Sequence, residues 1–74
     1  MYLNEEEKYY KRLIDERIER EGVVEVDYVI DNGNRCNIYN NNGQAILRGL
    51  TIREAYWVVN GILNFWAMIE KARR

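Results

Sequence analysis

Hydrophobic side chains are so dense between residues 51 and 69 that a helix there has only one polar stripe. At about 100° per residue, that stripe is formed by Arg53, Asn60, Asn64 and Lys71. Apolar side chains occupy most of the remaining circumference: Ile52, Ala55, Tyr56, Val58, Val59, Ile62, Leu63, Phe65, Trp66, Met68 and Ile69. The pattern predicts a helix over about residues 52–71 that begins at a Thr51–Glu54 capping box. Because one sheet or one helix covers only one face, we expect a second chain to cover the rest.

A second helix with a narrower apolar stripe is predicted over about residues 4–21. Asn4 is a favourable N-cap, the three Glu residues at 5–7 complement the helix dipole, and Gly22 is a typical C-terminal signal. The stripe consists of Tyr10, Leu13, Ile14 and Ile18, and Tyr9 lies beside it. The other faces are charged, so this helix is expected to cover the protein with one face only.

Three β-strands are predicted between the helices, over about residues 23–30, 35–39 and 44–48. Hydrophobic and polar residues alternate in the first of them, and two Asn-Gly pairs mark the turns. The sequence therefore predicts an α+β protein of α-β-β-β-α order in a single domain, residues 1–74. Its three-stranded antiparallel meander packs on the long C-terminal helix, and the N-terminal helix flanks it.

The loop lengths predict which residues pair across the sheet. A three-residue loop over 32–34 pairs Tyr28 with Ile38 and Ile30 with Cys36. A two-residue loop at Asn42-Gly43 pairs Ile38 with Leu47 and Tyr39 with Ile46. The expected inner face is Val24, Val26, Tyr28, Ile30, Cys36, Ile38, Ala45 and Leu47, and the expected outer face is Glu25, Asp27, Val29, Arg35, Asn37, Tyr39, Gln44, Ile46 and Arg48.

Composition favours a small soluble domain that binds no cofactor. The chain of 74 residues is 47% hydrophobic and carries 11 basic and 12 acidic residues, a net charge of −1. It has no His, Ser or Pro and a single cysteine, Cys36, which excludes a Ser-His or Cys-His triad within one chain and an internal disulfide and disfavours a structural zinc site. No signal peptide or membrane span is evident, so a cytoplasmic location is expected. Small domains without disulfides or metals often depend on oligomerisation.

The far side of the long helix is the predicted interaction surface. Trp57, Gly61, Phe65 and Met68 lie together there at helical spacing. A glycine inside a helix costs about 1 kcal/mol relative to alanine, which is best explained by the close approach of another backbone or ring. The N-terminal helix could supply that neighbour, but its stripe is thin. We therefore expect a homodimer, followed by binding to a host protein.

Other candidate chemistry has simpler explanations. Single-stranded nucleic acid could bind the outer sheet face through Arg35, Tyr39 and Arg48. A second candidate is the basic C-terminal end, which contains Lys71, Arg73 and Arg74. Acidic neighbours and the net charge make nucleic acid an unlikely partner. Acid-base catalysis by Glu25, Asp27 and Tyr39 would need strongly shifted pKa values in a cleft, so no enzyme is predicted. Turn chemistry explains Asp31 and its Asn neighbours better than calcium does. Cys36 is expected in the core.

Two resemblances bear on function. The order of elements resembles that of the double-stranded-RNA-binding domain, whose second helix begins with a Lys-rich cluster. Here residues 51–55 contain one base and one acid, and the loop 31–34 lacks that family's Gly-Pro-His. The segment Gly49-Leu50-Thr51-x-x-Glu54-Ala55 resembles a strand-to-helix junction of small phage accessory and inhibitor proteins. This second resemblance implies a non-enzymatic interaction module that acts on a host protein. The first strand, as an exposed edge, is a further candidate surface.

Overall fold

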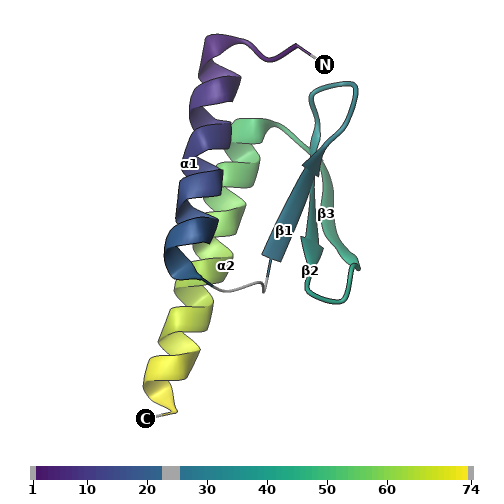
Figure 1. The fold of residues 1–74 in the computed structure, drawn as a ribbon. Coiled ribbons are helices and arrows are strands. Elements are labelled where there is room, and N and C mark those ends of the chain that lie inside the picture. Colours follow the sequence, from purple (N-terminus) through teal and green to yellow (C-terminus); the bar gives the residue numbers. More distant parts are fainter. Residues whose placement is uncertain (1, 23–25, 74) are drawn as a thin grey trace.

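The computed structural model describes residues 2–22 and 26–73. The chain folds as α1 (Glu5–Glu21), β1 (Val26–Ile30), β2 (Cys36–Asn40), β3 (Ala45–Leu50) and α2 (Ile52–Ala72), as Figure 1 shows. This order confirms the predicted α-β-β-β-α arrangement. The first predicted strand began at residue 23, and its residues 23–25 lie outside the described part of the chain.

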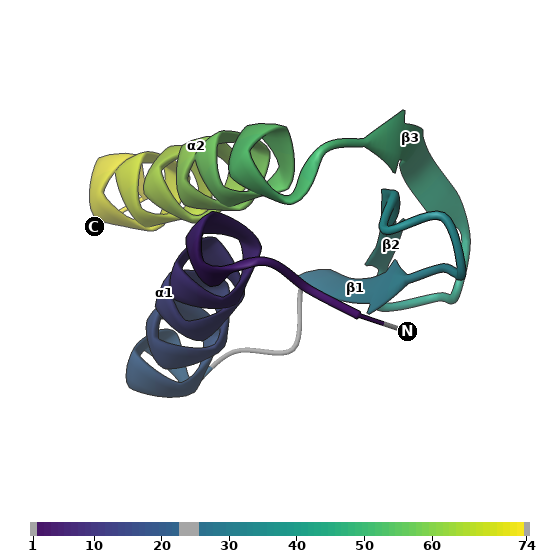
Figure 2. The ribbon, with the colours of Figure 1, turned by 90° about the horizontal axis from the view of Figure 1, so that it is seen from above.

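The two helices form one layer and the antiparallel sheet, in the order β1-β2-β3, forms the other. Both helices lie on the same side of the sheet and run in the same direction, with α1 beside the first half of α2 (Figures 1 and 2). The last turns of α2 extend beyond α1 and the sheet (Figure 1). The described molecule is consequently elongated, with extents of 44 × 23 × 17 Å.

The core between the layers is small. Its fully enclosed hydrophobic residues come from α1, the sheet and α2: Ile14, Val26, Cys36, Ile38, Ile52, Ala55, Val59 and Leu63. No aromatic side chain belongs to this enclosed set within the described residues. The aromatic residues Tyr10, Tyr28 and Tyr56 pack against this set but are only partly buried, so the fully enclosed core is small for a domain of this size.

Both helices begin with the predicted local chemistry. The Asn4 side chain accepts from the backbone N–H of Glu7 at 2.8 Å, and the Glu7 carboxylate accepts from the backbone N–H of Asn4 at 3.0 Å. Thr51 and Glu54 make the same reciprocal pair at 3.0 and 2.8 Å. The Glu54 hydrogen bonds lower the pKa of its carboxyl. These capping boxes satisfy N–H groups that a helix leaves unpaired at its start.

The first hairpin has the predicted three-residue loop, with Tyr28 paired to Ile38 and Ile30 to Cys36. The second hairpin was expected to have a two-residue loop, and this prediction was wrong. The backbone N–H of Asn40 donates to the carbonyl of Gln44 at 2.9 Å, so three residues form the loop. Tyr39 therefore pairs with Ala45 rather than with Ile46.

The two loops share one design, which explains the error. In each loop, the side-chain oxygen of the preceding residue accepts hydrogen bonds from the backbone N–H groups two and four positions later. The distances are 2.9 and 3.0 Å for Asp31 and 2.9 Å for both hydrogen bonds of Asn40. The third loop residue is left-handed in both, Asn34 at φ 58° and Gly43 at φ 78°. Asn and Gly are the residues that tolerate this conformation. The Asp and Asn residues at the turns thus serve turn geometry.

Strand β3 contains two register shifts, which change its exposure. Ile38 pairs with Leu47 as predicted, but Cys36 pairs with Leu50, so β3 carries an extra residue on each side of Leu47. Gly49 adopts φ 73°, and its N–H donates to the Asn37 side chain at 2.9 Å. Such bulges bend a strand. Ala45 and Leu47, expected on the inner face, are consequently not buried, and Leu47 is 42% exposed.

Candidate protein-interaction surface

Four residues of α2 that the sequence pattern grouped together form an exposed apolar surface, which we call the α2 outer face: Trp57, Gly61, Phe65 and Met68. The three side chains are 61%, 60% and 69% exposed, respectively. The enclosed residues of α2 follow the same helical spacing on another side, which packs against the sheet and α1. Within the described residues, therefore, the chain leaves these three side chains largely uncovered.

Helix α1 does not cover the α2 outer face because it packs on the polar stripe instead. The guanidinium of Arg17 donates to the side-chain oxygens of Asn60 at 2.8 Å and Asn64 at 2.6 Å. Nearer the start of both helices, the rings of Tyr10 and Tyr56 lie 5.5 Å apart. The Asn residues of the stripe thus contact α1 and specify where it docks.

Arg17 is a contact residue that the sequence analysis missed. Its side chain is only 16% exposed, and its Nε also lies 2.9 Å from a carboxylate oxygen of Glu21. Arg17 lies three and four residues after Ile14 and Leu13, on the same face of α1, and this spacing could have indicated its contact with α2. A charged residue within an apolar stripe indicates a polar partner on the facing element, since an unpaired buried charge is costly.

A shallow apolar groove adjoins the α2 outer face. It is lined by Ile46 of β3 and by Val58, Gly61, Ile62, Phe65 and Trp66 of α2, and has a volume of about 430 Å³. Ile46 was expected on the outer sheet face, whereas here it lines the groove beside the helix. The reason is the displaced register of β3.

Gly61 forms part of the groove, and no neighbour among the described residues requires a glycine at this position. A Cβ placed on Gly61 would have no heavy atom within 4 Å among the atoms surveyed around it. Among the described residues, therefore, α1 does not supply the close neighbour of Gly61 that the sequence analysis considered as an alternative. The absence of a side chain leaves a notch between Trp57 and Phe65, one helical turn away on either side.

The alternative nucleic-acid residues lie among acidic groups. Tyr39 pairs with Asp27 across the sheet, and both line a second shallow groove on the outer face. The charge of Arg35 contributes to the lowered pKa of Glu54, so these two side chains are neighbours. Arg48 is exposed on β3. Glu25, named with Asp27 and Tyr39 for acid-base chemistry, lies outside the described residues.

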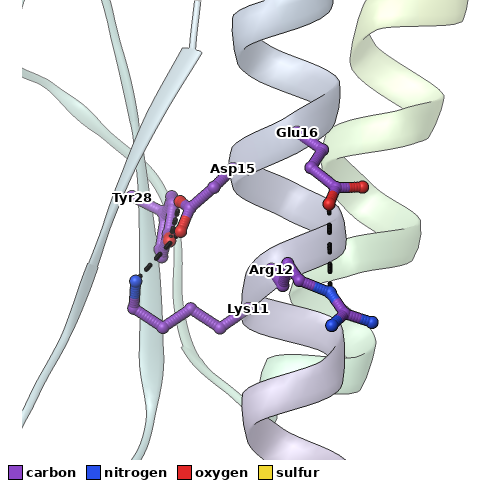
Figure 3. A network of polar contacts seen from close by, with 5 residues as sticks. All are labelled: Lys11, Arg12, Asp15, Glu16 and Tyr28. Atoms are coloured by element: carbon purple, nitrogen blue, oxygen red, sulfur yellow. Dashed lines mark hydrogen bonds and ion pairs between the residues drawn. The ribbon is translucent and has the colours of Figure 1, made fainter.

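A polar cluster joins α1 to β1 (Figure 3). The Tyr28 hydroxyl donates to one oxygen of Asp15, and the ammonium of Lys11 lies 3.0 Å from the other oxygen. Arg12 and Glu16 form a longer ion pair of 3.9 Å on the neighbouring surface. Burial and the Asp15 carboxylate raise the pKa of Tyr28. The phenol thus keeps its proton and serves as a hydrogen-bond donor between the layers.

Cys36 is fully enclosed, as predicted for a core residue. Burial raises the pKa of its thiol to about 11. Since the thiolate is the reactive form of cysteine, this environment suppresses nucleophilic chemistry. In residues 2–22 and 26–73, no group of three or more Cys, Asp or Glu side chains is arranged to hold a metal ion.

Comparisons with known proteins do not identify a relative: no protein family model, curated protein or solved structure matches this chain. Neither α1 nor α2, over the residues described, is long and apolar enough to span a membrane.

Proposed function

We propose that this protein is a non-enzymatic protein-binding module that forms a homodimer through the α2 outer face. The observation that carries the proposal is the exposure of Trp57, Phe65 and Met68 beside a glycine at which, among the described residues, an added Cβ would meet no heavy atom within 4 Å. Aromatic and Met side chains are enriched in the cores of protein interfaces. A cluster of them on one surface is typical of a binding site.

The size of the core supports self-association. Eight residues are enclosed in the described part of the chain, and Tyr10, Tyr28 and Tyr56 pack against them only partly buried, whereas the side chains of the α2 outer face remain exposed. Covering them in a dimer would transfer apolar area out of water at about 25 cal/mol per Å². Folding and association would then depend on the same side chains, as is common in small domains without disulfides or metals.

The proposed cellular role is that of a phage-type inhibitor or accessory factor that acts on a host protein. This part rests on the strand-to-helix segment from Gly49 to Ala55 and on the absence of a recognisable catalytic constellation in the sequence. Nucleic-acid binding is disfavoured because Tyr39 and Arg35 both lie close to acidic side chains, which repel phosphate groups.

The test of self-association is light scattering across a concentration series with Trp57→Ala and a matched control, Tyr9→Ala. Tyr9 is an exposed aromatic residue on α1 and does not belong to the α2 outer face. A two-fold dimer loses two Trp rings in the first variant, so at about 2 kcal/mol per ring the dissociation constant should rise by roughly 10²–10³-fold. The control should leave it unchanged.

A wild-type protein that remains monomeric at high micromolar concentration would refute the homodimer. Equal effects of Trp57→Ala and Tyr9→Ala would show that association is not centred on α2. Circular dichroism of each variant verifies that the helices and the sheet are still formed.

A further inference from the structure

We infer that two copies of this chain pack their α2 helices antiparallel, with a two-fold axis beside Gly61 and with Trp57 of each copy against Phe65 of the other. This inference rests on the proposed homodimer and specifies its geometry. It is carried by the positions of the two rings, four residues before and four residues after the glycine notch.

The spacing is symmetric about Gly61. Four residues of an α-helix rise about 6 Å, so Trp57 and Phe65 lie at equal distances on either side of the notch. A two-fold axis perpendicular to the helix at Gly61 reverses the second helix and places its Phe65 opposite Trp57. Two identical ring pairs then flank one glycine contact.

Gly61 allows the helices to approach closely. Packed helices are separated by about 8–10 Å, and the lower end of this range requires small residues at the crossing point. The space around Gly61 is open in the single chain. Two facing glycines would bring the backbones together and let the aromatic rings overlap on both sides.

The shape of the molecule favours the antiparallel arrangement. The last turns of α2 extend past α1 and the sheet, while its first half lies against them (Figure 1). In an antiparallel pair the extended end of one copy lies along the first half of the other, next to the groove that contains Ile46. In a parallel pair the two extended ends could cover only each other, and like charges at equivalent positions would face one another.

The uncovered area corresponds to one side of a standard interface. Trp57, Phe65 and Met68 are between 60% and 69% exposed. At about 200 Å² per large side chain, this leaves on the order of 380 Å² of apolar surface per copy. A standard interface buries about 800 Å² per partner, of which somewhat more than half is apolar. The exposed side chains of the α2 outer face therefore supply most of the apolar area that one partner of a stable dimer contributes.

Disulfide trapping tests the arrangement. Trp57→Cys and Phe65→Cys are prepared separately, mixed and oxidised, and wild type, whose one thiol is the buried Cys36, is the control. In the antiparallel dimer, Cys at 57 of one copy lies opposite Cys at 65 of the other, and the second ring pair remains intact. Equivalent positions are about 12 Å apart along the axis, beyond the roughly 7 Å that a disulfide spans between Cα atoms.

The expected result is a covalent dimer in the mixture that is at least tenfold more abundant than in either variant alone. Gly61→Cys keeps both rings and should form a covalent dimer by itself, which covers the case in which the ring variants fail to fold. Cross-linking of Trp57→Cys alone would show a parallel pair and overturn the inference. A wild-type dimer without cross-links in any variant would place the interface elsewhere, while a monomeric wild type would refute the proposed homodimer itself.

Discussion

Replacing Gly61 with alanine should have opposite effects on the single chain and on the dimer. Gly61 lies in the interior of α2, and an added Cβ meets no heavy atom within 4 Å. Alanine is favoured over glycine by about 1 kcal/mol in a helix. We therefore expect the free energy of unfolding of the monomer to increase by about 1 kcal/mol, which corresponds to roughly 4–8 °C in Tm for a domain of this size.

The same methyl group should weaken association. Two Cβ atoms would enter the proposed crossing point, and overpacking a close contact costs about 1–3 kcal/mol. The dissociation constant should consequently rise by about 5- to 150-fold. The matched control is Ala67→Gly, the reverse change at an exposed position of α2 that is not part of the α2 outer face. It should destabilise the fold by about 1 kcal/mol and leave the dimer unchanged.

Sedimentation equilibrium gives the dissociation constant, and urea unfolding over a concentration series separates the stability of the monomer from that of the dimer. A decrease in monomer stability in Gly61→Ala would refute the conclusion that the space at this position is free within the chain. An unchanged dissociation constant would refute the placement of Gly61 at the dimer crossing.

Three further predictions concern contacts between the layers. Arg17→Met removes two charge-assisted hydrogen bonds to α2 and should lower the free energy of unfolding in urea by about 1–3 kcal/mol; a loss below about 0.5 kcal/mol would contradict the docking role of Arg17. The pKa of Tyr28 is higher in the folded state than its ordinary value of 10.0, so the folded protein retains this proton while the unfolded chain loses it. The stability should therefore fall as the pH rises above 10, more steeply in wild type than in Tyr28→Phe, and identical slopes in urea unfolding would contradict this prediction. The thiol of Cys36, with a pKa of about 11, should react with iodoacetamide at pH 8 many times more slowly in the folded protein than in urea; equal rates, measured by mass spectrometry, would show that the thiol is accessible.

Most of the fold followed from local patterns. The capping boxes at Asn4 and Thr51 depend on residues three positions apart, and the helix periods depend on each segment alone. The register of the first hairpin followed from the requirement that its hydrophobic residues share one face. The second loop was mispredicted because the Asn42-Gly43 pair resembles a two-residue turn, whereas the Asn40 side chain stabilises the longer loop.

The candidate surface was only partly predictable from the sequence. Helical spacing was enough to group Trp57, Gly61, Phe65 and Met68 on one face. The contribution of Ile46 was not predicted, because it depends on the register of β3 relative to β2. The role of Arg17 also required the structure, since its partners are 43 and 47 residues away along the chain.

The helices, the strands and the excess of hydrophobic residues in α2 were predictable from the sequence, because these properties arise from interactions among neighbours along the chain. The contacts that cover the other sides of α2 join residues far apart along the chain, so they became known only from the structure. The hydrogen bonds of Arg17 with Asn60 and Asn64 hold α1 on the polar stripe, which leaves Trp57 and Phe65 exposed to solvent.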